Sequence, residues 1–224
     1  MTGRLRIAIP LFPRFTALDA IGPYEVLAQV PAFDIAFVGH ARGEVRDGSG
    51  MLGLVIDSTF EDLPDPDVVV FPGGDIRALQ SDGRVLDWVR GAHASTTFTT
   101  SVCTGSLVLG ASGLLRGLTA TTHWARYADL AACGATPAPE RVIEHLDRRI
   151  ITAAGVSAGI DMALRLTGLL VDPIAAQAAQ LLIEYDPQPP FDCGAPLKTS
   201  DELMARALEY DGSASDRRAK PERG

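Results

Sequence analysis

Short runs of apolar and β-branched residues alternate with longer stretches of helical pattern along this 224-residue chain, and this alternation constrains the fold more than any other feature. Four such runs lie in the first half of the chain, at Leu5–Leu11, Phe33–Val38, Val68–Phe71 and Thr96–Val102. Their unbroken apolar or β-branched character predicts strands buried on both faces, as in a parallel sheet. The sequence therefore predicts an α/β fold whose parallel sheet is covered by helices on both faces.

The segments between and after these runs carry the helical pattern. Asp172 directly precedes Pro173, which is the order expected of an N-cap followed by the first residue of a helix. Helices are expected at Pro23–Val30, Ile76–Arg90, Thr104–Leu115, Trp124–Ala132, Ser157–Val171, Ile174–Tyr185 and Ser200–Tyr210.

Two segments depart from this alternation. Residues Glu44–Asp57 and Val142–Ile151 each predict a small antiparallel hairpin around a polar turn. Asp186–Pro196 is rich in proline and is expected to be coil. Since no linker or repeat interrupts the chain, we expect residues 1–210 to form a single domain. Residues 211–224 have no apolar periodicity and predict a flexible C-terminal tail.

The composition excludes several classes of protein. Hydrophobic residues make up 46% of the chain and charged residues 21%, so a core can form and a disordered chain is excluded. The formal net charge of −8 argues against nucleic acid as a partner. No stretch reaches the roughly 18 uninterrupted apolar residues that a membrane span requires, and the N-terminus does not have the pattern of a secretory signal.

The three cysteines, Cys103, Cys133 and Cys193, are far apart and form no CxxC pair, which predicts a reducing cytoplasm. Only Cys103 lies between a predicted strand and a predicted helix, with Gly105 and Ser106 allowing a sharp turn after it. This is the cysteine version of a nucleophile elbow. The N-terminus of the following helix is expected to lower the thiol pKa. A buried structural cysteine is the alternative.

A Pro-Gly-Gly turn follows the strand that ends at Phe71 and would bring backbone N–H groups to the same edge of the sheet. Gly73 and Gly74 permit close approach to a ligand. The amide of Gly74 together with that of Thr104 would form an oxyanion or anion hole. A tight turn without a binding role is the alternative for these two glycines.

Taken together, the glycine turn and the cysteine elbow resemble the ThiJ/PfpI superfamily, whose flavodoxin-like fold is related to class I glutamine amidotransferases. The resemblance extends from Leu5 to about Tyr210 and includes residues 15–27, 121–124 and 153–161. Residues 15–23, 101–105 and 184–191 look most like the isonitrile hydratase branch.

What this resemblance implies is a reaction and three residue roles. The reaction adds water to an isonitrile to give an N-substituted formamide through a cysteine thioimidate, without a cofactor. Cys103 matches the nucleophile, Asp19 the carboxyl group beside it, and Thr104 the assisting residue that follows the cysteine. Proteases of the superfamily carry His in the place of Thr104, so this sequence departs from their pattern. The resemblance also implies a homodimer.

The residues around Asp19 and His123 leave two readings each. The apolar neighbours of Asp19 predict a desolvated carboxyl with a raised pKa, suited to an acid role, while a helix cap is the alternative. His123 is expected at a strand-to-helix junction near the site, either as a base that contacts the substrate or as a hydrogen-bonded cap. No HxxxH or HExxH spacing occurs, so no metal site is expected.

Two other functions are compatible with the same motifs. One is a different cysteine-dependent activity of the superfamily, such as glyoxalase-like or protein-repair chemistry. The other is a small-molecule-sensing regulator, because this domain forms the N-terminal half of AraC-type transcription regulators. Those regulators continue into a helix-turn-helix domain, whereas only one predicted helix and a short tail follow Asp186–Pro196 here.

Overall fold

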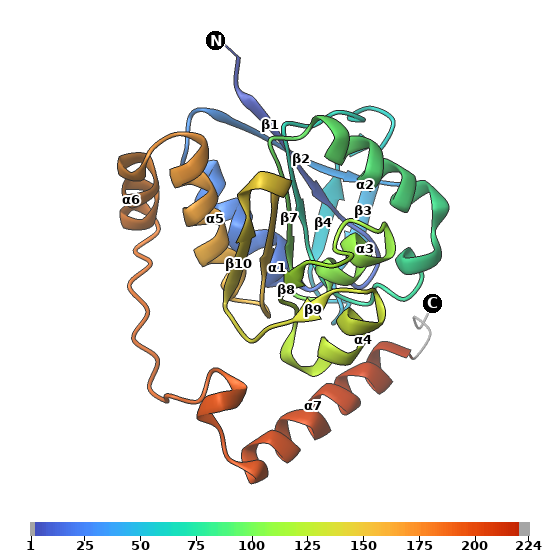
Figure 1. Cartoon of the computed structure of the whole chain (residues 1–224), viewed down its shortest axis with the longest axis vertical. Helices are drawn as coiled ribbons and strands as arrows, with labels where there is room; N and C mark the ends of the chain where they lie inside the picture. The colour runs from blue at the N-terminus through green and yellow to red at the C-terminus, as the bar shows by residue number, and fades with distance from the viewer. Residues whose placement is uncertain (1–2, 220–224) are drawn as a thin grey trace.

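A seven-stranded sheet forms the centre of the computed structural model, which describes residues 3–219 and the side chains as far as Asp211. Its strand order is β10-β11-β7-β6-β1-β2-β5, and only the pair β10–β11 is antiparallel (Figure 1). The strands are β1 (Leu5–Pro10), β2 (Phe33–Gly39), β5 (Ser58–Thr59), β6 (Val68–Phe71), β7 (Phe98–Val102), β10 (Val142–His145) and β11 (Ile150–Ala153).

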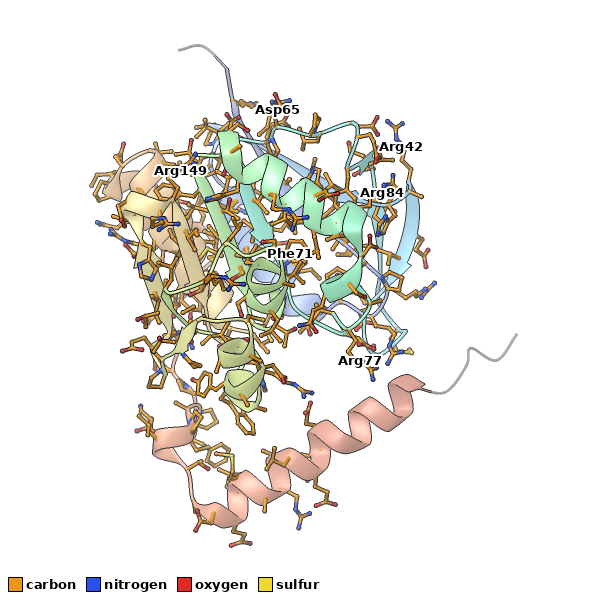
Figure 2. All side chains as sticks on the ribbon, turned by 45° about the vertical axis from the view of Figure 1, so that its right-hand side comes forward. Arg42, Asp65, Phe71, Arg77, Arg84 and Arg149 are labelled. Atoms are coloured by element: carbon orange, nitrogen blue, oxygen red, sulfur yellow. The ribbon has the colours of Figure 1, made fainter. Side chains whose placement is uncertain are left out.

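The central strands are buried on both faces, as their apolar sequences predicted. Every residue of β6 is buried, and so are the last four residues of β1 and of β7. Phe71, at the end of β6, is fully buried in the interior, whereas Arg42 and Arg77 lie at the periphery (Figure 2). Burial on both faces requires a layer of helices on each side of the sheet.

The helices form these two layers. On one side α1 (Ala17–Ala28) packs against α5 (Ala158–Leu170), and α5 packs against α6 (Pro173–Leu182). On the other side α2 (Gly83–Ser95) packs against α3 (Gly105–Ala111) (Figure 1). The predicted α/β fold with helices on both faces is therefore confirmed. Shorter elements are α4 (Tyr127–Ala132) and the 3-10 helices η1 (Leu79–Ser81), η2 (Trp124–Arg126), η3 (Leu146–Arg148) and η4 (Pro196–Lys198).

Both predicted hairpins are present. Strands β3 (Gly43–Arg46) and β4 (Gly53–Ile56) form a separate antiparallel pair. Strands β8 (Thr119–Ala120) and β9 (Thr136–Pro137) form another small sheet, in which the two strands are parallel. The hairpin β10–β11 is not separate from the main sheet, because β11 also pairs in parallel with β7. The predicted cap of α6 is confirmed, since the Asp172 carboxylate accepts a hydrogen bond from the amide of Ala175 at 2.8 Å.

Helices α1 and α2 differ most from their predicted starts. Helix α1 starts at Ala17 rather than at Pro23, and Pro23 lies inside it as a buried residue. The proline removes one helical hydrogen bond, and the packing of α1 on α5 compensates for that loss. Helix α2 starts at Gly83 rather than at Ile76, because the carboxylate of Asp82 caps it by accepting from the amides of Arg84 and Val85.

The sequence predicted a flexible tail from Asp211 onward, and the structure gives the described part of this segment a helical backbone, while its flexibility stays a prediction. Helix α7 (Asp201–Ala219) runs through this segment, and the remaining tail residues, 220–224, lie outside the described part. No apolar periodicity in the sequence marks a helix there, but a helix that has already formed can propagate through polar residues. The assignment of residues 1–210 to a single domain stays a prediction.

A long coil carries the chain from α6 to α7. From the end of α6 the coil leads to α7, which lies at the far end of the molecule, near α4 (Figure 1). The predicted coil at Asp186–Pro196 lies in this stretch, in which only η4 is helical. We call residues 184–211 the C-terminal arm. Among the described helices, none has the length and hydropathy needed to cross a membrane.

Candidate active site

Cys103 sits in a sharp turn between β7 and α3. Its φ of 56° lies in the left-handed region, which costs free energy for a residue with a side chain. Gly105 allows the helix to start directly above β6, because any side chain at that position would clash with the carbonyl of Phe71. The hydroxyl of Thr122 donates to the carbonyl of Cys103 at 3.0 Å and so holds the turn. The strained elbow predicted for Cys103 is therefore present.

Asp19 lies on α1 and meets Cys103 at the carboxyl edge of the sheet. The residue is fully buried, and its Oδ2 accepts a hydrogen bond from the amide of Gly73 at 2.9 Å. The thiol of Cys103 lies close enough to influence this carboxyl group, whose Oδ1 is buried without a hydrogen-bond partner among the described residues. Burial raises the pKa of Asp19 to about 7, against the opposing effects of the Gly73 amide and the Cys103 thiol. The carboxyl group thus bonds to the glycine turn and lies beside the thiol, while the N-cap residue of α1 is Thr16.

The two glycine amides have partners within the protein. The amide of Gly74 donates to the hydroxyl of Thr104 at 2.9 Å, and the same hydroxyl donates to the carbonyl of Gly74 at 3.1 Å. The amide of Gly73 is bonded to Asp19. The predicted anion hole is therefore not preformed by free N–H groups of these glycines, because nearby side chains take them up. Contact between Gly74 and a substrate stays a prediction.

The pKa of the Cys103 thiol is shifted in the opposite direction to the one that the sequence predicted. Burial and the charge of Asp19 raise the pKa well above its usual range. The nearby amides of Thr104 and Val156 oppose this shift. The prediction considered only the helix N-terminus, whereas the buried carboxylate comes from α1, a distant part of the chain. The free protein thus holds a neutral thiol beside a carboxyl group that titrates near neutrality.

A pocket of about 160 Å³ opens onto Cys103 and has a largely polar rim. His123 lines it, and its Nδ1 accepts a hydrogen bond from the amide of Ala125 at 3.4 Å, so the residue caps η2. Burial lowers the pKa of His123, which keeps the imidazole neutral. His123 therefore caps η2, and its contact with a substrate stays a prediction. The polar side chains of the rim are Thr16, Thr104, His123, Arg126 and Asp211.

Sequence reasoning missed several residues at this site. Val156 has a φ of 44°, which turns its amide toward the sulfur, but no pattern in the sequence marks a valine for such a conformation. Thr122 belongs to the Thr-Thr-His-Trp segment, so the motif contained it without revealing its bond to Cys103. Asp211 reaches the rim, 3.9 Å from Arg126, from the segment predicted to be a flexible tail.

The other two cysteines lie away from this site. Cys133 follows α4 and is partly buried, and Cys193 is exposed in the C-terminal arm. All three thiols are free. Among the residues that the structure describes, no three His, Cys, Asp or Glu side chains come together as a metal site would require.

The fold and the site together define a class of protein. It is an α/β protein in which a cysteine at the end of a central strand lies beside a buried carboxyl group. The chain belongs to the DJ-1/PfpI family, whose model matches residues 5–168. It is 46% identical over 208 residues to the isonitrile hydratase of Pseudomonas putida, and this match covers 91% of the chain and 90% of that protein.

Solved structures agree with this assignment. A THiJ/PfpI family protein from Pseudomonas syringae superimposes with a TM-score of 0.88 at 35% identity, covering 96% of this chain and 89% of that one. The Drosophila melanogaster protein DJ-1beta superimposes with a TM-score of 0.73 at 19% identity, covering 81% of this chain and 98% of its own. The second likeness shows the common fold.

Proposed function

We propose that this protein is an isonitrile hydratase-like enzyme, which adds water to an isonitrile to give an N-substituted formamide. The observation that carries the proposal is the pair formed by Cys103 and the buried Asp19, in a chain 46% identical to an isonitrile hydratase over most of its length. Hydration needs a nucleophile for the isocyano carbon and a group that delivers and accepts protons. The thiol and the carboxyl group supply these two functions.

The first step forms a covalent intermediate. The reactive state of the pair holds one proton, shared between Cys103 Sγ and the carboxyl group of Asp19. That proton moves to the isocyano carbon as the sulfur bonds to the same carbon, which gives the thioimidate R–N=CH–S–Cys. The amides of Thr104 and Val156, which face the sulfur, stabilise the negative charge on it during the transfer.

The second step hydrolyses the thioimidate. The Asp19 carboxylate takes a proton from water as the water oxygen attacks the carbon, and it passes that proton to the nitrogen, so that R–NH–CH(OH)–S–Cys forms. Breaking the C–S bond then releases R–NH–CHO, and the hydroxyl proton returns to the thiol–carboxyl pair. In this mechanism Thr104 acts through its amide, because its hydroxyl is bonded to Gly74.

The direct test is incubation with cyclohexyl isocyanide and detection of N-cyclohexylformamide by mass spectrometry. Wild-type protein should produce the formamide, and Cys103→Ala should not. Cys133→Ala is the matched control and should retain activity, since Cys133 lies away from the pocket. The proposal would be refuted if wild-type protein with an intact Cys103 thiol gave no formamide, or if Cys103→Ala kept full activity.

We also infer that the protein works as a homodimer in the cytoplasm. Large apolar side chains of α6 are exposed, among them Ile174 at 71% and Leu181 at 77%, which is typical of a face covered by a second subunit. Three free thiols suit a reducing compartment. Light scattering on the purified protein tests the dimer, and a monomeric mass at micromolar concentration would contradict it.

A further inference from the structure

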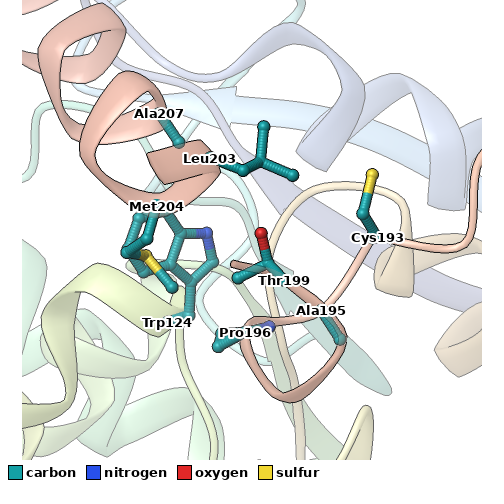
Figure 3. Close-up of a pocket in the computed structure, with 9 residues that line it drawn as sticks. Trp124, Cys193, Ala195, Pro196, Thr199, Leu203, Met204 and Ala207 are labelled. Carbon is teal, nitrogen blue, oxygen red and sulfur yellow. The ribbon is translucent and has the colours of Figure 1, made fainter. Parts of the chain in front are cut away.

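A second cavity lies beside the pocket at Cys103, between η2 and the C-terminal arm. Its volume is about 180 Å³. The indole of Trp124 forms one wall, and the arm forms the other with Pro196, Leu203, Met204 and Ala207 (Figure 3). These side chains are apolar, whereas the pocket at the cysteine has a polar rim. The two cavities therefore suit different parts of a ligand.

Two helices, η2 and α7, contribute side chains to both cavities. Helix η2 contributes Trp124 to the apolar cavity and Arg126 to the pocket at Cys103. Helix α7 contributes Ala207 to the apolar cavity and Asp211 to the pocket. Ala207 and Asp211 are four residues apart on one helix face, which is about 6 Å along the axis. The cavities consequently lie next to each other, about one helical turn apart.

We propose that the apolar cavity holds the N-substituent of the isonitrile while the isocyano carbon reaches Cys103. This inference rests on the proposed function and adds the substrate class to it. An apolar cavity of about 150 Å³ accommodates a benzene ring, so a cavity of about 180 Å³ accepts a phenyl or cyclohexyl group. Helix α7 and η2 thus select isonitriles that carry an apolar, ring-sized substituent.

One polar atom lies behind the apolar lining. The hydroxyl oxygen of Thr199 is buried and has no hydrogen-bond partner among the described residues. Figure 3 shows it directed toward the space between Leu203 and Trp124. Because this oxygen is buried beneath the surface of the cavity, the lining that a substituent would meet remains apolar.

The test compares two identical substitutions on α7. Ala207→Phe fills the cavity, whereas Ala205→Phe, the matched control, adds the same ring on an exposed part of the helix. Hydration of cyclohexyl isocyanide and of methyl isocyanide is measured as kcat/KM for wild type and both variants. We expect Ala207→Phe to lose at least about 10-fold with the cyclohexyl substrate, since even one misplaced methylene costs that much. Methyl isocyanide should change less than about 2-fold, which also shows that the variant is folded.

Binding of N-cyclohexylformamide, followed by titration calorimetry, separates this inference from the proposed function. If wild type hydrates no isonitrile but Ala207→Phe alone weakens formamide binding, the proposed function fails and the ligand cavity stands. Equal effects of the two phenylalanines, or equal losses with both substrates, would overturn the inference. A change of oligomeric state in Ala207→Phe but not in Ala205→Phe would assign the cavity to a second copy of the chain, and would also overturn it.

Discussion

Replacing Asp19 by Asn should make the protein more stable at neutral and alkaline pH while reducing its activity. The folded protein holds this carboxyl group with a pKa of about 7, against an ordinary value of 3.8. Between these two values the unfolded chain loses the proton and the folded chain keeps it, so the free energy of unfolding falls as pH rises. Asparagine has no proton to lose, and its side-chain oxygen can still accept from the amide of Gly73. The variant therefore escapes this pH-dependent loss.

The size of the effect follows from the pKa difference. About three pKa units at 1.36 kcal/mol each set an upper limit of about 4 kcal/mol on the stability that the variant gains relative to wild type between pH 4 and pH 8. Water entering the site reduces this figure, so we expect roughly 2–4 kcal/mol. For a chain of this size, the difference in Tm between Asp19→Asn and wild type should therefore be roughly 4–16 °C larger at pH 8 than at pH 4.

The assay is thermal and urea unfolding of both proteins from pH 4 to pH 9. Asp75→Asn is the matched control, because its Arg77 partner holds the pKa of Asp75 below the ordinary value. The control should therefore be less stable than wild type by a nearly constant amount from pH 9 to about pH 5, because this stabilisation is lost only as pH falls through and below the ordinary value of 3.8. Hydration by Asp19→Asn should fall by about 10²–10⁴-fold, the usual contribution of a general acid–base group. A stability difference that does not grow with pH would refute the assignment of a desolvated, proton-holding carboxyl group.

Three further predictions concern the thiol and the glycine turn. In wild type, kcat/KM should rise as pH increases through about 7, because acidification adds a second proton to the thiol–carboxyl pair, and this rise should be absent in Asp19→Asn. A flat pH profile in wild type would contradict the one-proton reactive state. Iodoacetamide at pH 7 should label exposed Cys193 before Cys103, and Cys103 should react faster in Asp19→Asn because the carboxylate that raises its pKa is gone; peptide mass mapping decides both points. Gly73→Ala should lower hydration by at least about 10²-fold, since its Cβ would lie 2.6 Å from the Thr104 amide and 2.8 Å from Asp19 Oδ2; near-normal activity would show that the turn can move without cost.

The sequence determined the parts of this protein that depend on neighbouring residues. The apolar runs of β1, β6 and β7 specified buried parallel strands, because their side chains alternate between two faces that must both be covered. The glycine after Cys103 specified the elbow, because only a residue without a side chain fits against the carbonyl of Phe71. The apolar neighbours of Asp19 predicted the direction of its pKa shift.

Only the tertiary structure decided what surrounds each of these groups. The thiol pKa rises because a carboxylate from α1 lies beside it, and the glycine amides are occupied because Asp19 and Thr104 reach them from other elements. Asp211 meets Arg126 because α7 extends through a segment whose polar sequence gave no sign of it. Local patterns record backbone preference and periodicity, whereas burial and charge interactions depend on segments brought together from far apart in the chain. The elbow could therefore be predicted from a few residues, while its chemistry depended on the whole fold.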